Sequence, residues 1–288
     1  MDTLADMAKP ESLAQFVIKR LLPKSYSKQL MEYYKKQTAD AYVVSFPKTG
    51  RTWLRVLLSE YFCQMHGIEP YQTMGFENLN QLNRAIPKIF FTHDDDYTGR
   101  PEDLATDKRL YQKRRVLFLV RDPRDVVVSL YFHRTKRDKD LSEDIDLASF
   151  AFGDSGGLKT IIAFYNIWLA ALASLDGALI LRYEDLHENA SGTMLKILEH
   201  LGVEKDVHCL AKAIDNATFN KMNRKEKESG FDRRLLRAGD IDDGESFKVR
   251  RGKVGGYTDY FTEDQIKTMD LLIQDRLTPL LGYTHLRD

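Results

Sequence analysis

Short apolar runs alternate along the chain with longer stretches whose hydrophobic residues follow helical spacing. Residues 41–46, 88–93 and 115–120 read as strands, and residues 178–186 hold a fourth. The Val-rich first run is typical of a strand covered on both faces. Helical spacing and end signals predict helices over residues 13–22, 26–36, 51–66, 124–134, 161–175 and 193–201. Strands that alternate with helices predict an α/β fold with a central, mostly parallel sheet and helices on both faces.

This pattern fits one domain over residues 1–288, with residues 1–40 as a helical N-terminal preamble. Two segments lack periodicity: the acidic stretch 137–146 and the charged, glycine-containing stretch 224–253. Long loops in compact domains often serve as lids or binding loops. We therefore expect residues 224–253 to form a mobile loop over an active site.

The charge balance narrows the class of protein. Lys plus Arg equals Asp plus Glu at 43 each, which argues against a nucleic-acid binder but leaves room for a local basic pocket. Cys63 and Cys209 are too few for a disulfide framework and fit a reducing compartment. No basic stretch followed by an apolar run opens the chain, and residues 161–175 are too short for a membrane span. We expect a cytoplasmic protein without a signal peptide or membrane span.

The first strand leads into its helix through the stretch SFPKTGRT, residues 45–52. A turn from a buried strand into a helix points several backbone N–H groups at one place, where the helix dipole adds positive charge. Gly50 permits a backbone conformation closed to other residues, Lys48 adds a charge, and Thr49 and Thr52 offer hydroxyl donors. The loop lacks the G-x-x-x-x-G-K-[ST] spacing of nucleoside triphosphate sites. It therefore suits one phosphate-sized anion better than three.

A second anion site is expected where the strand 115–120 ends. Arg121 stands there, at the end of a strand where open α/β sheets bind ligands. Asp122 remains a possible metal ligand, although Pro123 favours a helix start with Asp122 as its cap. Two anion sites at neighbouring strand ends suit a nucleotide with phosphates on two separate carbons. This strand-to-helix loop, together with helices on both faces of the sheet, predicts a P-loop-like three-layer α/β sandwich.

Four motifs in order carry a family resemblance. SFPKTGRTWL resembles the 5′-phosphosulfate loop of soluble, cytosolic-type sulfotransferases that use 3′-phosphoadenosine 5′-phosphosulfate (PAPS). RDPRDVVVSLYFH resembles the 3′-phosphate strand and helix of that family, RYEDL its Tyr-Glu-Asp segment, and VRRGKVGGYTDYFT its C-terminal Arg-Lys-Gly-x-x-Gly motif. The matches run from about Tyr42 to Thr262 and cover most of the chain.

The resemblance implies a site for PAPS and for its product, adenosine 3′,5′-bisphosphate (PAP), with no metal. The 5′-phosphosulfate would be bound by Lys48, Thr49, Gly50, Arg51, Thr52 and Trp53, with Trp53 also stacking on adenine. The 3′-phosphate would be bound by Arg121 and Ser129, helped by Arg250, Arg251 and Gly252. The adenine would contact Tyr183 and the pair Thr218 and Phe219, which resembles a Ser-Phe pair of the family.

His93 stands where the family carries its catalytic histidine, at the end of the strand FFTH. A hydroxyl or amine of a small-molecule acceptor must lose its proton as it attacks sulfur, and imidazole titrates near neutral pH. His93 is therefore expected as the general base. Lys48 is expected to stabilise the charge that develops on the bridging oxygen.

Several positions depart from the family pattern. Phe91 stands where the family usually has Lys, and Arg51 replaces a common Ser or Thr. The residues at 255–258 read GGYT in place of Gly-Asp-Trp-Lys, and the Lys and Val of the overlapping dimer motif are missing, so the oligomeric state stays open. Asp94, Asp95 and Asp96 suggest a polar wall for the acceptor pocket, or simply three solvated carboxylates.

Two alternatives to PAPS-dependent sulfuryl transfer remain at this point. One is a small-molecule kinase that uses ATP and Mg²⁺, with Asp122 holding the metal. The other is a nucleotide-binding scaffold that keeps the pocket and lacks catalysis.

Overall fold

The computed structural model describes residues 23–94, 97–142, 144–227 and 251–284. Several sequence-based predictions lie outside these ranges. They are the helix over residues 13–22, most of the loop over residues 224–253, and the side chains of Asp95, Asp96 and Arg250.

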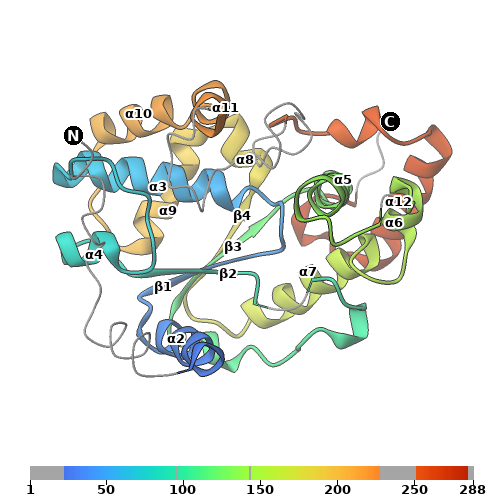
Figure 1. Ribbon diagram of the computed structural model, residues 1–288, viewed down its shortest axis with the longest axis horizontal. Helices are drawn as coiled ribbons and strands as arrows, with labels where there is room; N and C mark the ends of the chain where they lie inside the picture. The colour runs from blue at the N-terminus through green and yellow to red at the C-terminus, as the bar shows by residue number, and fades with distance from the viewer. Residues whose placement is uncertain (1–22, 95–96, 143, 228–250, 285–288) are drawn as a thin grey trace.

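Four parallel strands form the central sheet (Figure 1). In the spatial order β2-β1-β3-β4 they are β2 (Ile89–Thr92), β1 (Ala41–Ser45), β3 (Arg115–Val120) and β4 (Ala178–Arg182). The predicted parallel sheet is confirmed. Since β1 has β2 on one side and β3 on the other, the chain switches direction there, and ligands of such sheets bind beyond the carboxyl ends at the switch.

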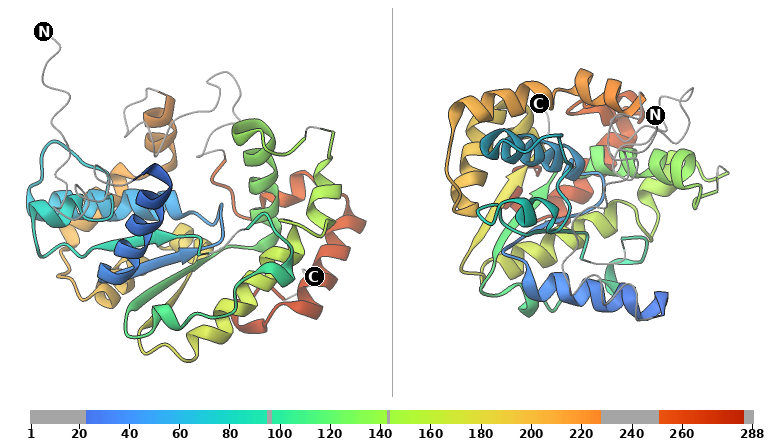
Figure 2. Two further views of the ribbon diagram at one scale, coloured as in Figure 1. Left: turned by 60° about the horizontal axis from the view of Figure 1, so that its bottom comes forward. Right: turned by 60° about the vertical axis from the view of Figure 1, so that its left-hand side comes forward.

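Helices cover both faces of the sheet, which confirms the three-layer α/β architecture (Figure 2). Successive side chains of a strand point to opposite faces, so on β3 Val116 and Phe118 join one buried cluster and Leu117 and Leu119 the other. The first cluster contains residues of α5 (Pro123–Phe132), α7 (Leu158–Leu172) and α12 (Glu263–Arg276). The second contains residues of α3 (Arg51–His66), α9 (Ala190–Leu201) and α10 (Val207–Asn216).

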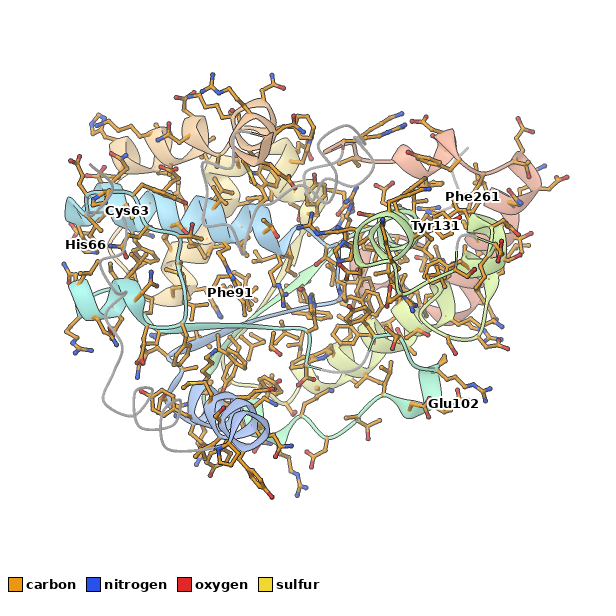
Figure 3. The ribbon with its side chains drawn as sticks, viewed as in Figure 1. Cys63, His66, Phe91, Glu102, Tyr131 and Phe261 are labelled. Carbon is orange, nitrogen blue, oxygen red and sulfur yellow. The ribbon has the colours of Figure 1, made fainter. Side chains whose placement is uncertain are left out.

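Helix α3 begins and ends at glycines in the left-handed region. Gly50 has a φ of 99° at the N-cap, and Gly67 has a φ of 58° at the C-cap, which are the ends that the sequence predicts. Cys63 and His66 lie in its last turns, at the end away from the strand-to-helix loop (Figure 3). The helix thus starts at the carboxyl edge of the sheet and directs its N-terminus there.

Other elements differ from the prediction at their ends. Helix α2 (Lys24–Thr38) contains the predicted 26–36, and α5 continues as the π-helix η3 (His133–Asp138), so residues 137–146 are not wholly loop. The RYEDL segment is divided, because β4 ends at Arg182 and α8 (Tyr183–Glu188) follows at once. Helix α11 (Phe219–Lys227) extends into the stretch expected as loop from residue 224.

The remaining elements are short and lie between the main ones. They are α4 (Asn78–Leu82), α6 (Leu147–Phe152) and the 3₁₀ turns η1 (Pro101–Asp103), η2 (Arg109–Tyr111), η5 (Gly256–Asp259) and η6 (Pro279–Leu281). Within the part of the chain that the structure describes, no helix combines the length and hydrophobicity that a membrane crossing requires.

Candidate functional site

A cavity of about 440 Å³ lies where the four strands end. Each strand delivers a lining residue just beyond its carboxyl end: Lys48 after β1, His93 after β2, Arg121 after β3 and Tyr183 after β4. The cavity is also lined by other predicted site residues, namely Gly50, Arg51, Thr52, Trp53, Ser129, Thr218, Phe219, Arg251 and Gly252. The structure therefore gathers into one cavity residues as far apart in the sequence as Lys48 and Gly252.

The loop after β1 turns sharply to begin α3. Lys48 has a φ of 70° and Gly50 a φ of 99°, so two residues of the loop lie in the left-handed region. A Cβ at Gly50 would lie 2.5 Å from Cδ2 of Tyr183, which explains why glycine is needed there. Thr49 was expected to offer its hydroxyl to the anion. Instead its side chain is buried, and its hydroxyl donates to the carbonyl of Phe46 at 2.9 Å. That hydroxyl stabilises the turn and does not face the cavity.

Arg121 is held in place by several contacts and keeps an unused donor. Its backbone N–H donates to the Tyr165 hydroxyl at 3.1 Å, and its Nη2 donates to the Lys253 carbonyl at 2.9 Å. Its guanidinium lies over the ring of Tyr183, 4.4 Å from the centroid. The buried Nε has no hydrogen-bond partner among the described residues. Because a buried unpaired donor is costly, and Arg121 lines the cavity, this atom fits an acceptor on a ligand.

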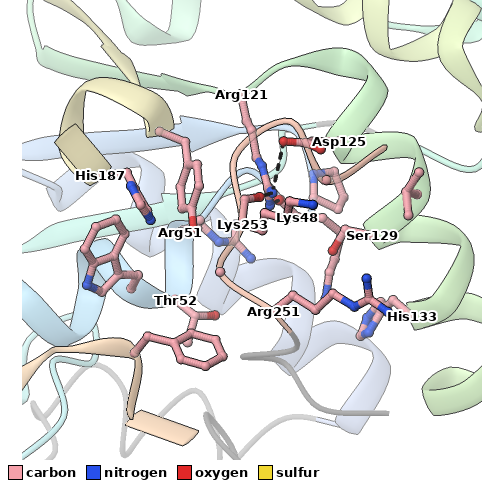
Figure 4. Close-up of a pocket in the computed structure, with 18 of the residues that line it drawn as sticks. Lys48, Arg51, Thr52, Arg121, Asp125, Ser129, His133, His187, Arg251 and Lys253 are labelled. Atoms are coloured by element: carbon pink, nitrogen blue, oxygen red, sulfur yellow. Dashed lines mark hydrogen bonds and ion pairs between the residues drawn. The ribbon is translucent and has the colours of Figure 1, made fainter. Parts of the chain in front are cut away.

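Asp125 joins Arg121 to the C-terminal loop, a role that the sequence analysis missed. Its carboxylate accepts from Arg121 Nη2 at 3.3 Å (Figure 4). It also accepts from Gly255 N–H at 2.9 Å and from Tyr257 N–H at 3.0 Å. Burial raises the pKa of Asp125, while Arg121 opposes the rise. The spacing of four residues between Arg121 and Asp125 was a visible signal, but the partners at 255 and 257 were not.

The described lining is strongly cationic. It contains Lys48, Arg51, Arg121, Arg251 and Lys253, against the single carboxylate of Asp125 (Figure 4). Asp259 partly balances the C-terminal pair, because it accepts from Arg251 at 3.2 Å and from Lys253 at 2.9 Å. The chain has no net charge overall, so this concentration of positive charge is local and suits an anionic ligand.

One end of the cavity is aromatic. The indole of Trp53 donates to the Ala217 carbonyl at 2.9 Å and packs edge-on against Tyr183, with ring centroids 5.6 Å apart. His187 also lines the cavity, with its ring 6.3 Å from that of Trp53. The sequence analysis missed His187, although it follows Tyr183 by one helical turn on α8. A Cβ at Gly252 would lie 2.6 Å from Cδ2 of Phe219, so the C-terminal loop packs closely onto this end.

Two contacts fix the tautomer of His93. Its Nδ1 donates to the Ser45 carbonyl at 2.8 Å, a contact that follows from the register of β1 and β2, in which Val44 pairs with Thr92. Its Nε2 is 2.7 Å from Arg51 Nη2. Since a guanidinium can only donate, Nε2 must carry the lone pair and Nδ1 the proton. Burial, then the Arg51 charge, lower the pKa of His93 to about 3, so the ring is neutral at physiological pH.

Phe91 and its surroundings explain part of the departure from the family pattern. Its side chain is 9% exposed and packs between the sheet and α3 (Figure 3). The guanidinium of Arg55 lies over this ring, 4.2 Å from the centroid. Neither Phe91 nor Arg55 lines the cavity, so the charge that a lysine at 91 would bring is not supplied from these two positions.

Asp94 does not form a polar wall of the cavity, and it is not solvated either. Its carboxylate pairs with Lys108 at 2.6 Å, both side chains are nearly inaccessible, and the Tyr111 hydroxyl also donates to it. Asp94 is absent from the cavity lining. The strand end turns at Asp94, where φ is 65°, and this turn directs the carboxylate into the protein. Both expectations for this residue are therefore wrong.

Asp122 is engaged as a helix cap. Its Oδ1 accepts from the N–H and the Nε of Arg124, each at 2.9 Å, and its Oδ2 accepts from Arg124 Nη2 at 2.7 Å. Because both oxygens bind Arg124, this carboxylate is not placed as a metal ligand for a kinase. In the ranges that the structure describes, no three His, Cys, Asp or Glu residues are grouped as a metal site requires.

Comparison with known proteins shows the family of this chain. The model of the sulfotransferase domain family matches residues 38–280. Flavonol 3-sulfotransferase of Flaveria bidentis is 25% identical over 272 residues, covering 85% of this chain and 83% of that protein. Sulfotransferase 2A1 of Mus musculus is 23% identical over 271 residues, covering 88% of this chain and 90% of that protein.

Solved structures share the fold. Retinol dehydratase in a complex with retinol and PAP superposes with a TM-score of 0.60 at 21% identity, covering 87% of this chain and 83% of that one. A mouse sulfotransferase complexed with PAP gives a TM-score of 0.58 at 19% identity, covering 83% of this chain and 84% of that one.

Proposed function

Because this chain belongs to the sulfotransferase family, we propose that it transfers a sulfuryl group from PAPS to a hydroxyl or amine of a small molecule, with His93 as the general base. The observation that carries this proposal is the arrangement of the four strand ends. They bring a neutral histidine, with Nδ1 protonated, into the same cavity as Lys48 and Arg121, where α3 adds Arg51 and the C-terminal loop adds Arg251 and Lys253.

The residues fit the two anionic groups of PAPS. Lys48, Gly50 and Thr52 line the cavity at the N-terminus of α3, where backbone N–H groups and the helix dipole favour a phosphate. Arg121 offers its Nε, which has no partner in the described part of the chain, and Ser129 lines the same cavity from α5. We assign the 5′-phosphosulfate to the first group and the 3′-phosphate to the second, with Arg251 and Gly252 contributing from the C-terminal loop. From the sequence, we propose that Arg250 also helps to bind the 3′-phosphate.

The aromatic end fits adenine. Trp53, Tyr183, Phe219 and the additional His187 present ring surfaces to the cavity, and Thr218 adds a hydroxyl. Tyr183 is itself covered by Arg121, so its orientation is fixed before any ligand arrives. We propose that these residues hold the base of PAPS and PAP, in agreement with the PAP-bound relatives of the same fold.

His93 can accept a proton only at Nε2, because its Nδ1–H is committed to the Ser45 carbonyl. When bound, PAPS supplies a sulfuryl group whose bond to the 5′-phosphate oxygen is ready to break. An acceptor oxygen or nitrogen forms a bond to sulfur, its proton passes to His93, and the electron pair of the broken bond leaves with the phosphate. Lys48 is placed on the loop that holds that phosphate and stabilises the charge it gains.

We also propose that the acceptor is a small molecule and that the protein is located in the cytoplasm. A small-molecule acceptor is supported by two structures of retinol dehydratase with the same fold, one in complex with androsterone and one with retinol. Tyr97 lines the cavity beside His93, with ring centroids 5.7 Å apart, and offers an apolar surface to such an acceptor. A cytoplasmic location is supported by a plant relative described as a cytosolic sulfotransferase. We further propose that residues 1–288 form a single domain.

Calorimetric titration with PAP and, separately, with ATP and Mg²⁺ tests the proposal. We expect PAP to bind without metal, and binding of ATP with Mg²⁺ alone would reject it. Turnover of labelled PAPS against a panel of phenols, alcohols and amines then tests catalysis. In this assay we expect His93→Ala to lose about 10²-fold or more in turnover and to retain PAP binding. A His93→Ala variant with undiminished turnover would exclude His93 as the base.

A further inference from the structure

Arg51 occupies an unexpected position in the site. It lies on the first turn of α3, yet its guanidinium reaches the end of β2 and donates from Nη2 to Nε2 of His93 at 2.7 Å. Nε2 is the atom through which the proposed base must accept a proton. In this geometry its lone pair is already occupied, so the base is covered.

The contact must break before any proton is transferred. The bond from Arg51 to the neutral His93 ring has a charged donor only, whereas a bond from the guanidinium to an ionised oxygen pairs two opposite charges and is frequently bidentate. An anionic group beside Arg51 would therefore draw the guanidinium away from the neutral imidazole. Burial and the neighbouring Arg55 lower the pKa of Arg51 to about 9, which still leaves it a cation at neutral pH.

We propose that Arg51 is a second catalytic cation, which covers Nε2 of His93 in the free protein and moves onto the transferring sulfuryl group when PAPS binds. The proposal rests on the function proposed above. It adds that the base is uncovered by the donor, so that proton removal from the acceptor is coupled to the presence of a sulfuryl group.

The position of Arg51 points to the sulfuryl group rather than to another anion. Arg51 lies between the loop assigned to the 5′-phosphosulfate and the histidine that faces the acceptor, which is where sulfur must lie during transfer. Arg121 lies on the other side of the loop, with Asp125 and the C-terminal loop, and serves the 3′-phosphate.

The departure at Phe91 strengthens this assignment. The resemblance implies a lysine at that position, and the buried phenyl ring supplies no charge. Arg55, one helical turn after Arg51, lies over that ring and does not line the cavity. Arg51 does line it, so a loop residue brings positive charge to the place where a strand residue does not.

Nuclear magnetic resonance of ¹⁵N-histidine-labelled protein tests the movement directly. The His93 signals are assigned by comparison with His93→Ala and followed without ligand, with PAP, and with PAPS in the absence of acceptor. We expect PAPS to shift the Nε2 resonance and PAP to leave it nearly unchanged, because PAP lacks the sulfuryl group. Equal shifts with both nucleotides, or none with either, would overturn the proposal.

The same experiment separates this inference from the proposed function. A protein that binds neither PAP nor PAPS by calorimetry fails the proposed function itself. If the protein binds and turns over PAPS but the His93 resonance does not change with nucleotide, the proposed function stands. Only the proposed role of Arg51 is then refuted.

Two substitutions at Arg51 and a control one turn later give a kinetic test. We expect Arg51→Ser to lower kcat about 10²-fold, the size typical of a lost electrostatic stabiliser, and to leave the PAP dissociation constant nearly unchanged. Arg51→Lys should recover part of kcat, and Arg55→Met, which removes a cation outside the cavity, should retain it. A loss of PAP affinity as large as the loss of kcat in Arg51→Ser would make Arg51 a phosphate ligand and overturn the proposal.

Discussion

Replacing Asp125 by Asn tests whether this carboxylate seats the C-terminal loop on the site. The substitution keeps the size of the side chain and removes its charge and one acceptor. Asp125 now accepts from Arg121, Gly255 and Tyr257, and its two oxygens serve both backbone donors. An asparagine has a single oxygen, so its amide nitrogen must face one of the two N–H groups.

The magnitude follows from these contacts. A buried backbone donor left without an acceptor costs about 1–3 kcal/mol. The hydrogen bond from Arg121 also loses its charged acceptor, which weakens it by roughly 1 kcal/mol. Against this, Arg121 without its carboxylate attracts a phosphate more strongly, by roughly 1 kcal/mol at a site of this exposure. The cost of the unpaired backbone donor exceeds the gain in attraction between Arg121 and the phosphate. We therefore expect PAP affinity to fall about tenfold to a hundredfold.

Calorimetric titration with PAP measures this loss, and a thermal melt reports the stability of the same sample. Asp270→Asn is the matched control, because Asp270 pairs with the buried Arg124 and does not line the cavity. The control should lower the melting temperature and leave PAP affinity unchanged. An Asp125→Asn protein that binds PAP as tightly as the wild type, or more tightly, would refute the view that Asp125 seats the loop.

Three further outcomes are expected. Gly50→Ala should weaken PAP binding about tenfold by calorimetry, because its Cβ would strain a φ of 99° and displace the Tyr183 ring 2.5 Å away; unchanged affinity would contradict this. Lys108→Met should destabilise the fold by about 3–5 kcal/mol in denaturant unfolding, since it leaves the buried Asp94 carboxylate without its 2.6 Å partner; a loss below about 1 kcal/mol would contradict this. The pKa of His93 falls to about 3 in the fold from its usual 6.5, so between these pH values the unfolded chain takes up a proton that the native protein does not. Stability should therefore decrease as pH falls through this window, by up to about 1.4 kcal/mol per unit, and His93→Gln should remove that part of the slope; parallel profiles for both proteins would contradict it.

Local sequence was enough for the main elements of the sheet and for the positions of its phosphate loop. The apolar runs at β1 and β3 are short, continuous and followed by helical spacing, so each strand and its neighbouring helix are specified within about twenty residues. Gly50 and Gly67 mark the ends of α3 because few other residues tolerate a positive φ. Parallel strands place their carboxyl ends together, and this is why the phosphate loop and Arg121 could be assigned to one site before their contacts were known, whereas His93 was assigned to it by the family resemblance.

Side-chain direction was less predictable, even next to correct elements. Thr49 and Asp94 both lie in the expected turns, and both point into the protein. Their directions depend on a carbonyl or a lysine that becomes available only when the turn is folded against its neighbours. RYEDL was likewise expected within one strand segment, while the structure changes to helix at Tyr183.

The sequence by itself determined a parallel α/β sheet, a phosphate loop and a histidine at the end of a neighbouring strand. Only the tertiary structure decided which groups meet across those strand ends. Asp125 reaches Gly255 over 130 residues of chain, and Arg51 reaches His93 over 42. Such contacts depend on strand register and on how loops pack, which are set by the whole core rather than by local preference. For that reason the sequence shows that Arg51 is an unusual residue of the phosphate loop, but only the folded protein shows that it contacts His93.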